Sequence, residues 1–287
     1  MTVQWASGDR PQLRSPLLIA AFEGWNDAAD AATAVVDHLA KTWGEQHVAE
    51  LDPDDYYVYT DTRPSVSLIE SAQETSRTIR WPQTRLSLCS PPGAERDLLL
   101  VRGVEPNLRW RGYCQAIVDV AHALGVDRAV TLGALLADSP HTRPIPVSGT
   151  ASDPQTAAEH GLAPSRYEGP TGIVGVLQDA LGRAAVPTVS LWAAVPHYVS
   201  APPCPKATVA LLHRLEDLLD LPLPLGDLPE QARAWERQVD ELAAEDSDVA
   251  EYIASLEERE PEIDLPEASG DAIAKEFERY LRRRDDR

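Results

Sequence analysis

The chain has 287 residues, of which 43% are hydrophobic and 25% charged, and its mean hydropathy is −0.29. This composition is typical of a globular protein, and no apolar run approaches the roughly 18 to 20 residues that a membrane helix needs. The formal net charge of −20 disfavours nucleic acid and membranes as partners, because both attract clustered Lys and Arg. The start of the chain lacks the order of a signal peptide, and its three cysteines form no disulfide pattern, so we expect a cytoplasmic protein.

Apolar segments of strand length alternate with segments of helical periodicity through most of the chain. The strands are predicted at residues 16–22, 97–103, 128–138 and 187–195, and the helices at 27–43, 109–125, 171–184 and 205–219. Continuous apolar strands joined by amphipathic helices are typical of a mainly parallel sheet that is covered on both faces.

Five shorter segments lie between the first predicted helix and the second long strand. They occupy residues 47–51, 55–60, 65–69, 77–81 and 85–90, and their length is typical of antiparallel strands or hairpins added to a sheet. We therefore predict an α/β fold with a mixed, mostly parallel sheet flanked by helices and followed by a helical C-terminal extension.

A change in composition near Gly226 predicts two regions, an α/β core domain at residues 1–226 and an acidic helical extension at 227–287. The extension has 20 acidic and 9 basic residues, and prolines precede it in the string LPLPLG. Helical spacing of apolar residues predicts helices at 229–245 and 268–284. We favour a helical cap packed on the core domain over an extension that binds a partner, because an acidic helix face is usually only solvated.

Ligands of open α/β sheets bind beyond the carboxyl ends of the strands, so the segments that follow the predicted strands are candidate sites. Four such segments carry charged and aromatic side chains, and a Gly-Pro-Thr-Gly turn opens another helix, where free N–H groups could hold an anion. The candidate ligand-binding residues are Glu23, Trp25, Asp27, Glu105, Arg109, Asp138, His141, Arg143, Thr171 and His197.

Each candidate also has a structural interpretation, which stays open at this stage. Asp27 is suited to cap the first helix, and Glu105 and Arg109 are close enough in sequence to form a local ion pair. Asp138 and His141 lack a third metal ligand, and the glycine turn is also explained by chain reversal and close packing. We expect no metal and no cofactor, and no complete catalytic motif decides whether the chain is an enzyme.

The strings FEGWNDAADAA, LLLVRGVEPNLRWRGYCQAIVD, LGALLADSPHTRPIPVSGTASD, YEGPTGIVGVL and LWAAVPHYVSAPPCPKATVALL, together with TDTRPSV and RTIRWP, occur in this order along the chain. In this combination the chain resembles the proteasome assembly chaperone 2 family in its bacterial, actinobacterial-type branch, over about residues 15–220. The resemblance implies a core similar to the phosphorylase/hydrolase-like fold of purine nucleoside phosphorylases, and oligomeric assembly. The family takes its name from eukaryotic relatives that help proteasome α-subunits to assemble.

The sequence leaves two functions open. The first is a non-enzymatic scaffold or assembly-chaperone-like protein that forms a homo-oligomer, for which a trimer is one possibility, and that meets a protein partner through its acidic tail. The alternative is a small-molecule-binding protein or an enzyme acting on a nucleoside-like or anionic ligand. In the alternative, Arg109 and Arg143 hold the anionic group, Glu23, Glu105 or Asp138 moves a proton, and His197 donates a hydrogen bond.

Overall fold

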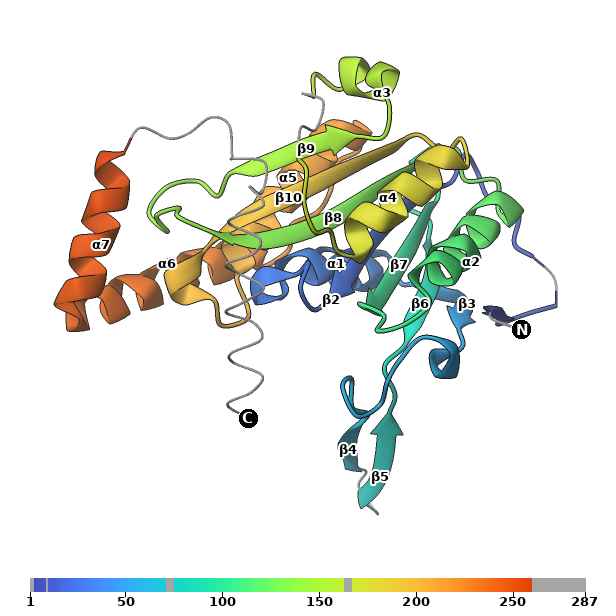
Figure 1. The fold of residues 1–287 in the computed structure, drawn as a ribbon, viewed down its shortest axis with the longest axis horizontal. Helices are drawn as coiled ribbons and strands as arrows, with labels where there is room; N and C mark the ends of the chain where they lie inside the picture. The colour runs from blue at the N-terminus through green and yellow to red at the C-terminus, as the bar shows by residue number, and fades with distance from the viewer. Residues whose placement is uncertain (1–2, 9, 71–74, 163–166, 260–287) are drawn as a thin grey trace.

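The computed structural model describes residues 3–8, 10–70, 75–162 and 167–259. Its centre is an eight-stranded sheet in the order β1-β3-β6-β7-β2-β8-β10-β9 (Figure 1). The strands of this sheet are β1 (Val3–Trp5), β2 (Leu17–Glu23), β3 (Gln46–Leu51), β6 (Thr84–Cys89), β7 (Leu98–Val104), β8 (Arg128–Ala137), β9 (Val147–Ala151) and β10 (Thr188–Pro196). The four inner strands β7, β2, β8 and β10 are parallel, and antiparallel strands flank them on both sides.

The buried central strand β2 shows why the sheet needs helices on both faces. Its side chains alternate with a period of two, so that Leu17 and Ile19 enter one hydrophobic cluster and Leu18 and Phe22 enter the other. Helices α1 (Ala31–Trp43) and α5 (Pro205–Leu219) supply the first cluster, and α2 (Trp110–Ala123) and α4 (Ile173–Arg183) the second. The predicted fold class, a mixed and mostly parallel sheet between helices, is confirmed.

The C-terminal part of the described chain consists of two helices, α6 (Leu228–Glu245) and α7 (Ser247–Glu258). Helix α6 lies against α5, and its Trp235 and Val239 belong to the same buried cluster as α1 and α5. Neither these helices nor any other described helix is long and apolar enough to cross a membrane. The predicted helix at 268–284 lies outside the described residues, and the division of the chain at residues 226 and 227 stays a prediction.

One predicted strand is wrong, because residues 55–60 do not form one. Asp52 accepts a hydrogen bond from the Asp54 amide and starts the 3-10 turn η2 (Pro53–Asp55), which diverts the chain inward. Tyr56 and Tyr57 are then buried against the sheet, and the Tyr57 hydroxyl donates to the Val104 carbonyl at 2.8 Å. Four elements besides the 3-10 turns were not predicted: β1, β9, helix α3 (Pro154–Glu159) and helix α7.

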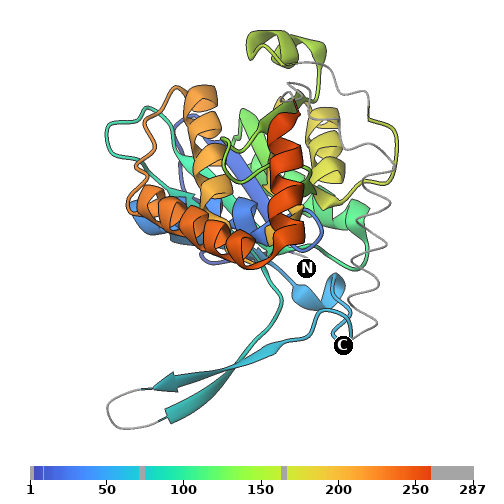
Figure 2. The same ribbon diagram turned by 90° about the vertical axis from the view of Figure 1, so that its left-hand side faces the viewer.

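Strands β4 (Ser65–Glu70) and β5 (Thr75–Arg80) form an antiparallel hairpin that is separate from the large sheet. Figure 2 shows this hairpin extending away from the body of the molecule. We call residues 63–81 the arm. The sequence correctly predicted its two strands, and the structure adds that they project instead of widening the sheet.

Candidate functional site

The carboxyl ends of the four parallel strands lie at one edge of the sheet. Glu23 at the end of β2 stands beside Val104 of β7, and Pro196 at the end of β10 stands beside Ala137 of β8. The segments that follow these strands, which contain nine of the ten candidate residues, therefore meet at this edge, as expected for parallel strands. They divide into a group beyond β2 and β7 and a group beyond β8 and β10.

Glu105 is the centre of the first group. Its Oε1 accepts hydrogen bonds from Asn26 Nδ2 at 2.7 Å and from the backbone N–H of Ile173, the first residue of α4, at 2.9 Å. Burial raises the pKa of Glu105, and these hydrogen bonds act against that rise. A carboxylate at a helix amino end is favoured by the helix dipole, so the helix start that could hold an external anion holds the carboxylate of Glu105.

The glycine turn before α4 is packed closely against this group. A Cβ at Gly172 would lie 2.1 Å from Asn26 Oδ1, so only glycine permits this approach. The candidate Thr171 lies over the first turn of α4, because a Cβ at Gly175 would lie 2.2 Å from Thr171 Oγ1. Two polar atoms here, Trp25 Nε1 and Asn26 Oδ1, are buried without a hydrogen-bond partner among the described residues.

Asp27 is buried at the start of α1, with 4% of its surface exposed. Its carboxylate accepts the amide of Ala32 at 2.6 Å and also the amide and hydroxyl of Thr33. Burial raises the pKa of Asp27 to about 6. These contacts are those of a helix cap, although 3-10 turn η1 (Ala28–Asp30) separates Asp27 from the helix itself.

Glu23 and Arg109, the two other charged candidates of this group, each form an ion pair with a residue outside the candidate set. Arg102 binds the carboxylates of Glu23 at 2.6 Å and Asp37 at 2.5 Å. Arg109 binds Asp55 at 2.7 Å and is 68% exposed, so the local ion pair with Glu105, which the sequence left open as one interpretation, does not form. The sequence favoured that pair by proximity, but the Arg109 backbone has a positive φ of 54° at the start of α2, and Glu105 is held by Asn26.

His141 is the centre of the second group and is 2% exposed. Its backbone N–H donates to the Tyr198 hydroxyl at 2.7 Å, and its Nδ1 lies 2.8 Å from the same hydroxyl. Its Nε2 lies 3.0 Å from Asp240 Oδ1 on α6. A neutral imidazole with its proton on Nε2 satisfies all three contacts, because the Tyr198 hydroxyl then donates to Nδ1 while Nε2 donates to Asp240.

Helix α7 covers the remaining candidates beyond β8 and β10. Arg143 donates to the backbone carbonyls of Glu257 and Arg259, and the neighbouring Thr142 donates to the Glu257 carboxylate at 2.5 Å. His197 lies 3.3 Å from Asp138, and its ring contacts the ring of Tyr252 on α7 with centroids 5.2 Å apart. The second group is therefore held by side chains and carbonyls of the acidic helices.

Lys206, at the start of α5, also connects the His141 segment to helix α6. Its ammonium group donates to the His141 carbonyl at 2.5 Å and pairs with the Glu236 carboxylate on α6. Sequence reasoning missed Asp240, Tyr252 and Glu257 as partners of the candidate residues, and Glu236 as the partner of Lys206. The apolar spacing of α6 predicted a helix that covers a surface, but nothing in the sequence indicated which surface.

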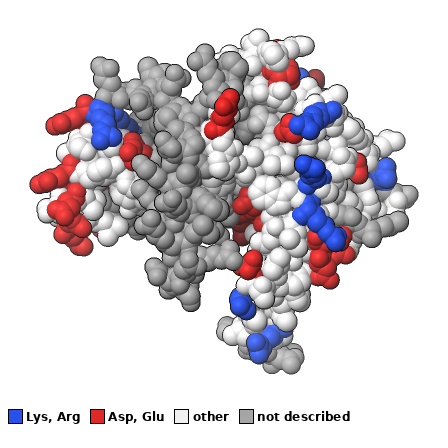
Figure 3. Space-filling model, viewed as in Figure 1, with Lys and Arg blue, Asp and Glu red and all other residues white. Residues whose placement is uncertain are grey.

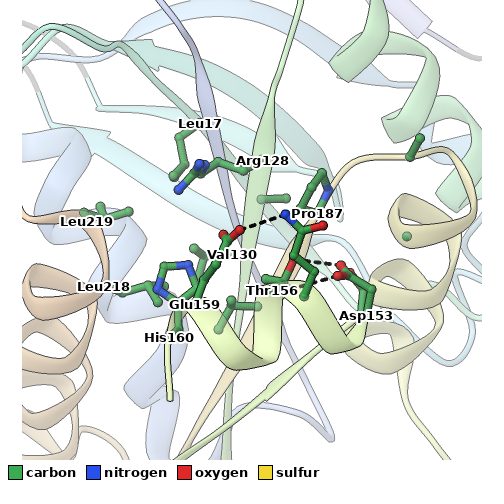
Figure 4. Close-up of a pocket in the computed structure, with 16 residues that line it drawn as sticks. Leu17, Arg128, Val130, Asp153, Thr156, Glu159, His160, Pro187, Leu218 and Leu219 are labelled. Carbon is green, nitrogen blue, oxygen red and sulfur yellow. Dashed lines mark hydrogen bonds between the residues drawn. The ribbon is translucent and has the colours of Figure 1, made fainter. Parts of the chain in front are cut away.

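A cavity of about 450 Å³ lies at the opposite edge of the sheet, where β2 and β8 begin (Figure 4). Its wall includes Leu17, Arg128, Asp153, Thr156 and His160, and none of the ten candidate residues. Asp153 is engaged within the chain, because it accepts from the amide and the hydroxyl of Thr156 and caps α3. Among the described residues, no three His, Cys, Asp or Glu side chains gather as metal ligands.

The fold and the sequence both have close counterparts among solved structures. A PAC2 family protein from Streptomyces avermitilis has 57% identity and a TM-score of 0.77, and the match covers 83% of this chain and 99% of that one. A proteasome-assembly chaperone homologue from Mycobacterium tuberculosis has 53% identity and a TM-score of 0.75, with the same two coverages. An archaeal proteasome activator from Pyrococcus furiosus, at 16% identity, shares the fold with a TM-score of 0.64 over 84% of this chain and 98% of that one.

The family assignment rests on a longer stretch of sequence than the candidate site alone. The comparison with curated proteins finds no match. The sequence matches the PAC2 family over residues 21–243, a range that begins in β2 and ends near the end of α6. The resemblance expected from the central motifs is confirmed, and the chain belongs to the PAC2 family.

Proposed function

We propose that this chain is a non-enzymatic, oligomeric scaffold that helps other proteins to assemble. The observation that carries the proposal is the engagement of the candidate site within the chain itself. Glu105 caps α4, Asp27 caps α1, and His141 and Arg143 are bound by α6 and α7. A site that turns over a small molecule needs polar groups that are free to meet it, and these groups already have partners.

The descriptions of two relatives indicate which kind of partner to propose. The homologue from Mycobacterium tuberculosis, at 53% identity, is described as related to proteasome-assembly chaperones, and the more distant archaeal protein as a proteasome activator. We extend this description to the present chain and propose that it binds proteasome subunits of its own organism. The acidic helices α6 and α7 offer charged surface for such a contact, although Trp235 and Val239 of α6 belong to the core and Ile253 and Leu256 of α7 are buried.

Binding to a defined partner tests the proposal directly. The full chain is mixed with purified proteasome α-subunits of the same organism, and complexes are measured by sedimentation velocity at several concentrations. We expect a complex of fixed stoichiometry that forms with the α-subunits and not with serum albumin, an acidic protein used as a control. If no complex forms at micromolar concentrations, the proposed partner is wrong.

A ligand screen tests the non-enzymatic part of the proposal. A compound at 100 times its dissociation constant stabilises a native protein by about 2.7 kcal/mol, which raises its melting temperature measurably. Nucleosides, nucleotides and inorganic phosphate should leave the melting temperature unchanged. A shift with any of them that disappears in the Arg109→Ala or Arg143→Ala variant would instead support the small-molecule function.

A further inference from the structure

The arm exposes an apolar face that no described element covers. Val66 lies opposite Ile79 in the hairpin, and Leu68 and Trp81 lie two residues further along the same face. These four side chains are 52%, 56%, 63% and 47% exposed, and they are four of the six large hydrophobic residues that are exposed in the described chain. The opposite face has the cross-strand pairs Ser67 with Thr78 and Ile69 with Ser76.

We expect the apolar face of such a hairpin to be covered by another surface in solution. An isolated pair of strands is marginally stable in water, and a clustered apolar surface on a soluble protein usually marks a place of interaction. At the base of the arm Trp81 makes an edge contact with Tyr59, whereas Val66, Leu68 and Ile79 are more than half exposed. The exposed part of the arm therefore fits a partner that lies outside the single chain.

The charge of the arm selects the kind of partner. Arg77 lies on the apolar face opposite Leu68. Residues 63–81 have three Arg and two Glu, a net charge of +1, whereas the whole chain has a net charge of −20. An acidic surface with an exposed apolar residue at its centre is complementary to the arm.

The corner between α6 and α7 is a surface of this description. Leu242 is 59% exposed, and the exposed Glu241 and Glu245 flank it. The stretch 240–251 has six acidic residues and no Lys or Arg. Figure 3 shows acidic side chains over the α6–α7 side of the molecule and basic side chains on the arm, at a different side.

We propose that the arm of one copy docks on the α6–α7 corner of a second copy, with Leu68 and Ile79 against Leu242 and Arg77 beside Glu241 and Glu245. This inference rests on the oligomeric part of the proposed function. Because the arm and the corner are different surfaces, two copies can exchange arms reciprocally in a dimer, or each chain can give its arm to one neighbour and receive the arm of another. Such a head-to-tail contact builds a closed ring or an open filament.

Charge exchange at the contact tests this arrangement. The oligomeric state of the full chain is measured by light scattering after size exclusion, over a range of concentrations. Leu68→Ser, Arg77→Glu and Glu241→Arg should each weaken self-association by at least tenfold, and the double variant Arg77→Glu with Glu241→Arg should recover most of it. Leu108→Ser changes an exposed apolar residue elsewhere, with 46% of its surface accessible, and should leave self-association unchanged.

The possible results separate this inference from the proposed function. Circular dichroism first confirms that each variant is folded, which we expect because the changed side chains are exposed. If the wild-type chain is an oligomer that the arm and corner variants do not affect, the docking arrangement is wrong and the scaffold proposal stands. If the variants remain oligomers but lose the α-subunits, the arm instead binds the partner. A wild-type chain that is monomeric at every concentration contradicts both self-association and this contact.

Discussion

The carboxyl edge of the sheet and the arm differ in which residues they contain and in how those residues are surrounded. The edge collects charged side chains, and these have partners within the chain, as Glu105 has in Asn26 and the Ile173 amide. The arm collects apolar side chains, and Val66, Leu68 and Ile79 are more than half exposed. Charged residues at a position where ligands usually bind are thus bound within the chain, while apolar side chains of the arm are exposed.

The difference has a physical origin. A buried carboxylate without a partner costs several kcal/mol, so a sequence that places one at a helix start must also supply donors for it. An exposed leucine costs little by itself, so a folded chain tolerates it, and a cluster of such residues persists where another surface covers it.

The largest effect is expected from Trp235→Ala, which removes the main apolar contact of α6 with the core. Loss of a buried tryptophan costs about 3 to 5 kcal/mol of unfolding free energy. Because α6 and α7 bind His141 and Arg143, the same change should also loosen the cover over the β8 and β10 strand ends. Urea unfolding measures the free energy of unfolding. Hydrogen exchange of the backbone amides at residues 138–143 measures how far the cover is loosened.

Arg237→Ala is the control for this experiment, because Arg237 lies on the exposed side of the same helix. We expect its effect to stay within about 0.5 kcal/mol. A cost below about 1 kcal/mol for Trp235→Ala would mean that α6 is not an integral part of the core.

Next in size is Glu105→Ala, which leaves the Ile173 amide and Asn26 Nδ2 without an acceptor. The expected cost is about 2 to 3 kcal/mol, because both donors lose a bond to a charged group. Glu105→Gln keeps an oxygen in place and removes a carboxylate whose pKa is raised by burial, so it should cost about 1 kcal/mol or less. Equal losses in the two variants would mean that the charge itself, for example toward a ligand, is what Glu105 contributes.

Asp27 predicts a dependence of stability on pH. Its pKa of about 6 in the folded chain lies above its ordinary value of 3.8, so the folded state binds the proton more tightly than the unfolded state. This contribution is complete below pH 3.8 and is lost as the pH rises through 6. Between pH 7.5 and pH 5 the native state should therefore gain roughly 1 kcal/mol from Asp27.

The Asp27→Asn variant isolates this contribution, because an amide oxygen still accepts the Ala32 amide and carries no charge. Urea unfolding of both proteins at pH 5 and pH 7.5 gives the difference between their pH dependences. Parallel pH profiles for the two proteins would show that Asp27 titrates at its ordinary value.

The sequence allowed the main elements of the fold to be predicted because the strands are long and uniformly apolar and the helices have a clear period. The short strand β9 escaped notice because its sequence VSGTA is neither apolar nor alternating, and all five of its residues are only partly buried. Residues 55–60 are aromatic enough for a strand, but Asp52 and Pro53 turn the chain before them. The local pattern of apolar residues does not reveal such a turn. The capping residue Asp52 and the proline that follows it must be considered as well.

At the candidate site, the sequence predicted which segments meet and not what each side chain binds. The strand-end rule brought Glu105 and His141 to the same edge because parallel strands share a direction. Their partners come from distant parts of the chain, since Ile173 is 68 residues from Glu105 and Asp240 is 99 residues from His141. Such pairs depend on how α4 and α6 pack, which is decided by tertiary contacts and not by local spacing.

The smallest effect is expected where the edge meets α6, at Asp240. His141 is buried, but Asp240 is 62% exposed, so water can replace its carboxylate as the acceptor for Nε2. Asp240→Ala should therefore cost only about 0.5 kcal/mol. Tyr198→Phe removes the hydroxyl that binds both the amide and Nδ1 of His141 inside the protein, and it should cost about 1 to 2 kcal/mol. Urea unfolding of the two variants compares these contacts under the same conditions. A larger loss for Asp240→Ala than for Tyr198→Phe would mean that the contact of His141 with Asp240, and not the one with Tyr198, holds the C-terminal helices to the edge.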